Sequence, residues 1–298
     1  DVKVTDLKVI GCSGGAHIAR SLSQELKISL VLVETRFFPD GEVYVRVPGT
    51  VGKEAIIVQS MAKRPNDFLM EFLLTLEALS SMGVKRLVGV IPYFPYARQD
   101  SRFKPGEALS VEVISRLLEQ LNLDLVLTVD VHLHRRKLEE IFKGLKVVNI
   151  SAMEKLAEYF LKKYTLDDAI VVAPDVEAEQ WASIFAKKLG LRYVVFTKER
   201  KGDEDVIIKE EIYEREKVET AIVVDDIVST GSTLEAIANI LLDKANNLYA
   251  AFTHAILVPP AEHRLSLYKD IVSTDTIVNP YSKIKVGPLI AKTLVKYI

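Results

Sequence analysis

The sequence predicts an α/β protein built from mainly parallel sheets that helices cover on both faces. Short apolar runs alternate with segments of helical period along the chain, which is the pattern of strand–helix–strand units. The apolar runs are continuous, as expected for strands that are buried on both faces of a sheet. The length of 298 residues exceeds a typical domain of about 150 residues, so we expect two domains.

The candidate strands form two series, and helix-period segments lie between them. The first series comprises Lys8–Ile10, Leu30–Val33, Ala55–Gln59, Leu87–Ile91, Leu125–Val129 and Lys146–Val148. The second comprises Ala169–Val172, Tyr193–Phe196, Thr220–Val224 and Ala250–Leu257. The expected helices lie near 66–82, 108–121, 152–164, 177–189 and 233–244. A boundary around Asn149–Ser151 gives domains 1–149 and 150–298, with the last helix packing back on the first domain.

Two pairs of segments look alike in the two halves. Ala55–Gln59 is similar to Ala169–Ala173, and a helix-period segment follows each. Leu87–Ile91 is similar to Ala221–Val224, and a polar loop follows each. Shared strand–helix chemistry alone could produce these likenesses, so duplication and coincidence both stay open.

The composition describes a globular protein and excludes several classes. Hydrophobic residues make up 49% and charged residues 27%, and the net charge of −2 argues against nucleic acid as the main partner. No apolar run approaches the roughly 20 residues of a membrane span. No apolar signal segment stands near Asp1, so we expect a cytoplasmic protein. The lone Cys12 excludes an internal disulfide and cannot build a zinc site by itself.

One segment joins two acids to a loop rich in hydroxyl groups. Asp225 and Asp226 follow an apolar run, and a helical pattern follows the loop of Ser229, Thr230, Gly231, Ser232 and Thr233. Backbone N–H groups at a helix N-terminus lack intrahelical partners and lie at the positive end of the helix dipole, so they suit a phosphate. The carboxylates suit sugar hydroxyls and Mg²⁺. The segment therefore predicts a phosphorylated-sugar site at the carboxyl edge of a sheet.

The alternative interpretation is an ordinary strand–helix turn in which the acids cap the helix. Paired acids after an apolar run, with four hydroxyl residues before the helix, favour the phosphate site. The segment resembles the 5-phosphoribosyl-1-pyrophosphate (PRPP) binding motif of the type I phosphoribosyltransferase fold. In that family the acids hold the ribose hydroxyls and the loop holds the 5′-phosphate. Ser232 stands where the family often has glycine, and it is still small.

Two stretches of the first half combine aromatic and charged residues. Arg36–Glu42 has aromatics, two acids and a turn; a hairpin turn with a buried phenylalanine is the alternative. Tyr93–Arg102 follows a strand end and contains aromatics, two arginines and an amide. Arginine suits bidentate phosphate binding and aromatic rings stack on bases, so this stretch indicates nucleotide binding.

Two more stretches remain ambiguous from the residues alone. Leu127–His134 ends a strand with Asp130, His132 and His134, a set too sparse for zinc and compatible with a structural role. Thr197–Asp203 follows a strand and is highly charged. It is either a solvated loop or a mobile lid whose cations close on phosphates.

Together these motifs resemble ribose-phosphate pyrophosphokinases, also called PRPP synthetases, along nearly the whole chain, and we expect an archaeal-type member. The resemblance assigns the adenine-binding loop to Phe38, Asp40 and Glu42, and the ATP segment to Arg98, Gln99 and Asp100. It assigns ATP and magnesium binding to His132 and a second magnesium position to Asp175, which follows Pro174. It places the catalytic flexible loop at Lys198 and Arg200, and the ribose 5-phosphate site at Asp225–Thr233.

The resemblance implies two tandem type I phosphoribosyltransferase-like domains, each a mainly parallel sheet flanked by helices. It also implies Mg²⁺-dependent transfer of pyrophosphoryl from ATP to O1 of ribose 5-phosphate, which gives PRPP and AMP. The family completes its ATP site with the adenine-binding loop of a neighbouring subunit, so it implies at least a homodimer. No residue is needed as a covalent nucleophile.

Two other functions compete with this expectation. A transferase that consumes PRPP shares the Asp225–Thr233 loop but leaves Phe38–Glu42 and Arg98–Asp100 unexplained. A regulatory relative without turnover is disfavoured by the presence of Lys198 and Arg200.

Overall fold

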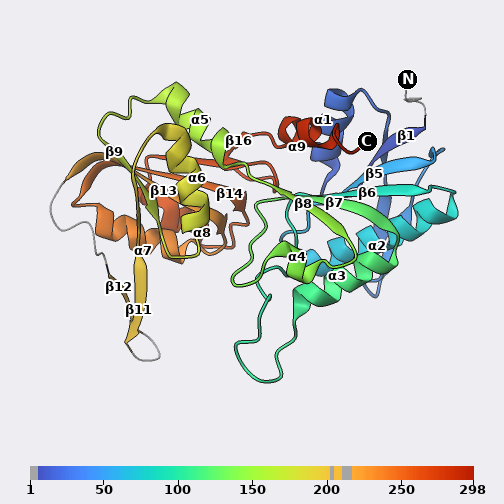
Figure 1. Cartoon of the computed structure of the whole chain (residues 1–298), viewed down its shortest axis with the longest axis horizontal. Coiled ribbons are helices and arrows are strands. Elements are labelled where there is room, and N and C mark those ends of the chain that lie inside the picture. The colour runs from blue at the N-terminus through green and yellow to red at the C-terminus, as the bar shows by residue number, and fades with distance from the viewer. Residues whose placement is uncertain (1–5, 202–204, 210–216) are drawn as a thin grey trace. The chain divides into compact units, whose positions relative to one another are not determined.

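The structure is a computed structural model that describes residues 6–201, 205–209 and 217–298; for residues 198–201 and 205–209 it describes the backbone alone. The chain divides into two compact units (Figure 1). The first comprises residues 1–150 and 285–298, and the second comprises residues 151–284. The C-terminal segment therefore packs with the N-terminal unit.

The first unit is built on a six-stranded parallel sheet. The strands run in the order β2 (Leu30–Leu32), β1 (Leu7–Gly11), β5 (Glu54–Val58), β6 (Arg86–Ile91), β7 (Leu123–Val129) and β8 (Lys146–Ile150). Most residues of the inner strands are buried, which explains their continuous apolar sequence.

Helices cover both faces of this sheet (Figure 1). On one face, α1 (Ala16–Leu26) packs against α9 (Gly287–Leu294). On the other lie α2 (Pro65–Ser81) and α3 (Ser110–Gln120), with the short α4 (Leu138–Ile141) beside α3. Helix α2 begins with Pro65, whose missing N–H costs nothing in the first turn. Its Phe72 and Leu76 enter the core beneath the sheet.

The second unit repeats this plan with its own six-stranded parallel sheet. The strand order is β10 (Tyr193–Val195), β9 (Ala169–Ala173), β13 (Val218–Val228), β14 (Ala245–Ala255), β15 (Asp270–Thr274) and β16 (Ser282–Ile284). Its helices are α5 (Met153–Lys163), α6 (Glu179–Leu189), α7 (Ser232–Leu241) and α8 (Ala261–Arg264), followed by the 3₁₀ turn η1 (Leu265–Leu267).

Alternate residues of the inner strands fill two separate cores. Ile170 and Val172 of β9 join the core that includes the buried face of α7. Val171 and Ala173 join the other core, formed with α5 and α6. Because successive strand residues point to opposite faces, this division shows a sheet buried on both sides.

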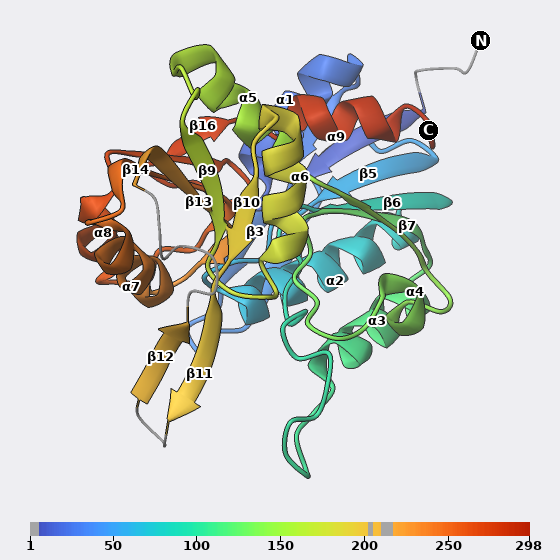
Figure 2. The ribbon, with the colours of Figure 1, turned by 60° about the vertical axis from the view of Figure 1, so that its left-hand side comes forward.

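Each sheet has an antiparallel two-stranded ribbon inserted after its edge strand. The first unit has β3 (Glu34–Phe37) paired with β4 (Val43–Arg46), and the second has β11 (Thr197–Lys201) paired with β12 (Asp205–Lys209). Figure 2 shows the β11–β12 ribbon extending away from the second sheet. In the described part of the chain, each sheet has the second strand of its unit, β2 or β10, at one edge. The first strand of the unit, β1 or β9, lies next to it, and the remaining strands follow in chain order.

The shared strand order identifies the equivalent strands of the two units. It pairs β1 with β9 and β5 with β13. The sequence likeness had matched the β5 segment with the β9 segment and the β6 segment with the β13 segment, and those matches were wrong. All buried parallel strands have similar apolar sequences, so local similarity could not give the correct correspondence.

Candidate functional site

The paired acids lie inside strand β13, whereas the sequence indicated that the strand ends before them. β13 continues beside β14 through Asp225, which is opposite Phe252, to Val228. On the other side its register with β9 ends at Val223, because β9 stops at Ala173. The acids therefore lie beyond the carboxyl end of β9, at the position where the strand order reverses and open α/β sheets bind ligands.

The environment of Asp225 is strongly unfavourable to negative charge. Asp226 is 1% exposed, and its backbone N–H donates to Oδ1 of Asp225 at 2.9 Å. Burial raises the pKa of Asp225 well above its usual value, and the charges of Asp226 and Asp175 raise it further. The strand order thus brings Asp175, which follows β9, into the electrostatic environment of Asp225.

These carboxylates suit a cation that also binds a substrate. Asp175 accepts the N–H of Ala178 through Oδ1 at 2.9 Å, which fixes it just before α6. In the described part of the chain, no group of three or more His, Cys, Asp or Glu side chains could hold a metal ion. Mg²⁺ commonly binds one or two carboxylates and takes its other ligands from water and substrate phosphates. The donor set therefore fits a magnesium ion that arrives with substrate.

The hydroxyl-rich loop leads directly into helix α7. Gly231 is the N-cap residue with φ 78°, and no described side chain caps the helix. Ser232 and Thr230 are exposed, and their hydroxyl oxygens lie 3.3 Å apart. Ser229 and Thr233 are half-buried. The first N–H groups of α7 and the hydroxyls of this loop provide the donors that a phosphate monoester requires.

Arg264 braces this loop from α8, and the sequence interpretation missed it. Its Nη1 donates to the carbonyl of Thr230 at 3.2 Å, and its Nε lies 3.2 Å from Oε2 of Glu235. Val258 donates its N–H to the carbonyl of Ser229 at 2.9 Å. These contacts join segments about thirty residues apart, so a local sequence pattern cannot predict them.

The Phe38–Glu42 segment is the turn of the β3–β4 hairpin. Gly41 has φ 95°, and its N–H donates to the carbonyl of Phe38 at 2.9 Å. The hairpin alternative was therefore correct, but Phe38 is 39% exposed and not buried as that alternative supposed. Asp40 and Glu42 are exposed as well. The hairpin thus presents an aromatic ring and two carboxylates to solvent.

Glu71 of α2 fixes the base of this hairpin, and the sequence interpretation also missed it. It is 2% exposed and accepts the N–H and the hydroxyl of Ser13 at 2.7 and 2.5 Å, together with the Thr35 hydroxyl at 2.9 Å. A buried carboxylate with three donors is a stable anchor because its charge is compensated by hydrogen bonds.

The loop between β6 and α3 contains the expected ATP segment. Arg98 is exposed. Gln99 is half-buried and donates through Nε2 to the carbonyl of Ser101 at 2.8 Å. Asp100 is fully buried and accepts hydrogen bonds from the loop that follows β7. The three residues therefore differ: two can reach a ligand at the surface, and one lies in the interior.

The loop after β7 brings two histidines into contact. His132 and His134 are half-buried, and their Nε2 atoms lie 3.1 Å apart. Asp130 is 1% exposed and has φ 42°. The β7 loop and the β6–α3 loop follow neighbouring strands of the same sheet, which brings the two predicted ATP segments together in the first unit.

The expected catalytic residues lie on strand β11. Lys198 is opposite Ile208 and Arg200 is opposite Val206 in the backbone register with β12. The side chains of Lys198 and Arg200 lie outside the part of the chain that the structure describes.

Comparisons with known proteins identify the family. Residues 7–121 match the family model of the N-terminal domain of ribose phosphate pyrophosphokinase, and residues 137–288 match that of the phosphoribosyl transferase domain. The ribose-phosphate pyrophosphokinase of Methanopyrus kandleri is 35% identical over 292 residues, covering 96% of this chain and 98% of that protein. The chain belongs to the ribose-phosphate pyrophosphokinase family.

Other relatives agree with this assignment. Ribose-phosphate pyrophosphokinase 1 of Archaeoglobus fulgidus is 39% identical over 262 residues, covering 86% of this chain and 89% of that protein. The crystal structure of phosphoribosylpyrophosphate synthetase from Mycobacterium smegmatis superposes with a TM-score of 0.85 at 26% identity, covering 97% of this chain and 98% of that one.

Membership confirms the main expectations from the sequence. The protein is an enzyme of a diphosphotransferase family with archaeal relatives, and it has two phosphoribosyltransferase-type domains with parallel sheets flanked by helices. Among the described residues, none of the helices has the length and apolar character needed to cross a membrane.

Proposed function

We propose that this enzyme transfers the pyrophosphoryl group of ATP to O1 of ribose 5-phosphate, giving PRPP and AMP for nucleotide biosynthesis. The observation that carries the proposal is the arrangement of Asp225 and Asp226 beside the N-terminus of α7. This arrangement provides acceptors for sugar hydroxyls next to donors for a 5′-phosphate. Family membership supports the same substrates.

In the second unit, the residues of the β13–α7 segment bind the sugar phosphate. Ser229, Thr230, Ser232 and Thr233, with the N–H groups around Gly231, hold the phosphate. Asp225 and Asp226 orient the ribose, so that O1 is held ready for attack on the β-phosphorus. Positioning of this kind is the main way in which proteins accelerate phosphoryl-type transfers, because the reaction needs little covalent help.

In the first unit, the nucleotide is bound by the exposed parts of two segments. Arg98 and Gln99 contact the phosphates, and His132 contributes from the loop after β7. Phe38, with Asp40 and Glu42, binds adenine for a neighbouring copy of the chain, so we propose a homo-oligomer of at least two copies. We also propose that the enzyme works in the cytoplasm.

Mg²⁺ completes the proposed chemistry. We assign one magnesium position to His132 in the first unit and a second position to Asp175 in the second unit, and ions bound there would neutralise phosphate charge. Lys198 and Arg200 meet the charge that develops on the transferred group.

The sugar assignment can be tested by titration. Asp225→Ala removes the acceptor oxygens of a half-buried carboxylate, and a hydrogen bond to a charged group contributes about 1.5–3 kcal/mol. We therefore expect ribose 5-phosphate to bind roughly 10- to 100-fold more weakly in calorimetry, with ATP affinity changed little. Asp168→Ala is the matched control, because Asp168 accepts the N–H of Glu219 at the other end of the same sheet. A loss confined to ATP would overturn the assignment.

A further inference from the structure

Asp100 has contacts unlike those of a residue that meets substrate directly. Its side chain is 0% exposed, although its neighbour Arg98 in the same loop is exposed. Its Oδ2 accepts the backbone N–H groups of three successive residues, His134, Arg135 and Arg136, at 2.8, 2.8 and 3.1 Å. Successive N–H groups that converge on one oxygen form a nest, which is an anion-binding conformation of the backbone.

The charge of Asp100 is compensated by these bonds. Burial alone would raise its pKa, but the N–H groups of Arg135, Arg136 and His134 outweigh burial and hold the pKa below its usual value. The other oxygen, Oδ1, is buried and has no hydrogen-bond partner among the described residues. The hydrogen bonds of this carboxylate thus come from a single loop, the one that follows β7.

That loop carries His132. The ring of His134, whose backbone N–H Asp100 accepts, lies against the ring of His132 with 3.1 Å between their Nε2 atoms. At the start of the loop, Val131 donates its N–H to Oδ1 of Asn149 at 3.1 Å. A continuous set of contacts therefore runs from Asp100 through His134 to His132.

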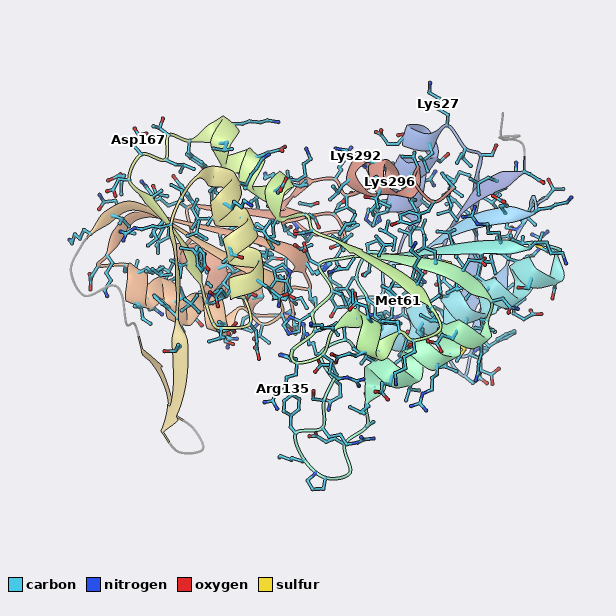
Figure 3. The ribbon with its side chains drawn as sticks, in the orientation of Figure 1. Lys27, Met61, Arg135, Asp167, Lys292 and Lys296 are labelled. Atoms are coloured by element: carbon cyan, nitrogen blue, oxygen red, sulfur yellow. The ribbon has the colours of Figure 1, made fainter. Side chains whose placement is uncertain are left out.

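The two loops also touch at the surface. The guanidinium of Arg135, which is labelled in Figure 3, lies 5.1 Å from the ring centre of Phe103. Phe103 is 52% exposed and meets the ring of His134 edge-on. Arg136 forms an ion pair with Glu112 of α3. The Phe103 contacts are exposed, and contacts of this kind are weak, whereas the half-buried Arg136–Glu112 pair holds the loop after β7 to α3 and not to the loop after β6. The buried carboxylate is therefore the principal link between the two loops.

We propose that Asp100 is a positioning residue that locks the loop after β7 to the loop after β6, so that His132 keeps a fixed place relative to Arg98 and Gln99. This inference replaces the direct ATP contact that the resemblance assigned to Asp100. The predicted effect on catalysis rests on the proposed function. The anchoring of residues 134–136 by Asp100 is independent of the proposed function.

Hydrogen exchange tests the anchoring without any assay of activity. In the wild-type protein, the amides of His134, Arg135 and Arg136 should exchange slowly although they lie outside helices and strands. In Asp100→Asn, exchange in a peptide covering residues 131–137 should be at least about 10-fold faster, because a neutral amide oxygen is a weaker acceptor than a carboxylate. Fast exchange of these amides in the wild type, or no change in the variant, would overturn the proposal.

Asp124→Asn is the matched control. Asp124 lies on the same strand, β7, and its Oδ2 accepts the N–H of Leu87 at 2.9 Å at the opposite edge of the sheet. Asp124→Asn therefore makes the same change, from a carboxylate to an amide, in a side chain that also accepts a backbone N–H. We expect it to leave exchange in residues 131–137 unchanged. Equal acceleration in both variants would mean general destabilisation and would sink the proposal.

Kinetics separate positioning from direct contact. Asp100→Asn should raise KM for ATP at least about 10-fold, since small misplacements of binding groups are costly, and should leave KM for ribose 5-phosphate within about 2-fold. In a His132→Ala background, the same substitution should add little, because its effect passes through the His132 loop. Additive effects would show that Asp100 contacts ATP itself, contrary to the proposal. A wild-type protein that makes no AMP would refute the proposed function, whereas the exchange data would still decide the anchoring.

Discussion

Asp225 is a residue whose charge destabilises the free protein. Its pKa is raised by burial and by the neighbouring charges of Asp226 and Asp175. For an acid with a raised pKa in the folded state, folding is favoured below the unfolded pKa and is penalised as pH rises through the folded pKa. At neutral pH the unfolded carboxyl is ionised, so the folded protein bears the cost of this unfavourable environment, and a substrate-bound cation would relieve it.

Asp225→Asn should therefore stabilise the substrate-free enzyme while damaging its function. Asparagine keeps an oxygen that can accept the N–H of Asp226 and removes the like charge. In buffer with EDTA at pH 7, we expect Tm to rise by a few degrees, since about 1 kcal/mol shifts Tm by 2–4 °C in proteins of 150–250 residues. The gain should shrink as pH falls toward the unfolded pKa of about 4, because the folded carboxyl is already protonated there and the unfolded carboxyl also takes up its proton.

Asp270→Asn is the control, for which we expect the opposite change in Tm. Burial would raise the pKa of Asp270, but hydrogen bonds from Lys163, Tyr164 and Tyr159 outweigh it and lower the pKa. Its charge therefore stabilises the fold above the unfolded pKa, and its loss should lower Tm. A fall in Tm for Asp225→Asn as well would contradict the electrostatic account.

At this scale the sequence shows which acids lie in polar segments after apolar runs but not what each acid does. Asp100 and Asp225 both belong to polar segments at strand ends. Only the structure shows that three N–H groups surround the first, whereas carboxylates surround the second. The roles of these acids, like those of Arg264 and Glu71, depend on contacts between segments that are distant in the sequence. A local sequence pattern therefore cannot predict them.

Among the elements, the loop before α7 depends on one backbone conformation. Gly231 has φ 78°, and a Cβ atom there would lie 3.3 Å from the carbonyl oxygen of Ala261 and 3.4 Å from its Cα. Side chains rarely adopt this φ, and a methyl group here would need the loop or α8 to shift by a few tenths of an ångström.

Gly231→Ala should weaken use of ribose 5-phosphate, whereas Gly190→Ala should not. Gly190 ends α6 with φ 69°, and a Cβ atom there meets nothing within 4 Å. Both variants should lose about 1–2 kcal/mol of stability from the strained φ. Only Gly231→Ala should raise KM for ribose 5-phosphate, by about 10-fold or more, because its loop must move. Equal KM values for the two variants in steady-state kinetics would argue against a phosphate site here.

The β11 strand carries the residues that we assign to the transition state. Loss of an interaction that is made only in the transition state lowers kcat and leaves KM little changed. Lys198→Ala and Arg200→Ala should each lose at least about 10²-fold in kcat, with KM values shifting only several-fold. Lys187→Ala, in the last turn of α6, is a control of the same charge in the same unit. Near-wild-type kcat in both test variants would indicate that β11 is a solvated surface ribbon without a catalytic role.

Core strands and helices were predictable, whereas the ribbons were not. The Leu87–Ile91 run matches β6 to within one residue, because burial on both faces demands a continuous apolar sequence. The ribbon strands β3 and β11 carry charged residues and lie outside the main sheets, so hydrophobic periodicity does not mark them. β13 was predicted too short because polar residues continue its backbone pairing with β14.

In the whole molecule, the same strand order occurs in both units, and the proposed substrates divide between them. The sequence predicted two α/β domains from length and alternation. It could not predict the strand order, because that order depends on pairings between distant segments.

The identity of the transferred group is the central claim, and product analysis tests it most directly. Purified protein with ATP, Mg²⁺ and ribose 5-phosphate should be followed by ³¹P NMR, with reactions lacking each substrate as controls. We expect AMP and PRPP in equal amounts, formed only when all components are present. Formation of ADP with a sugar bisphosphate would show transfer of the γ-phosphoryl group and would contradict the account, as would the absence of any product.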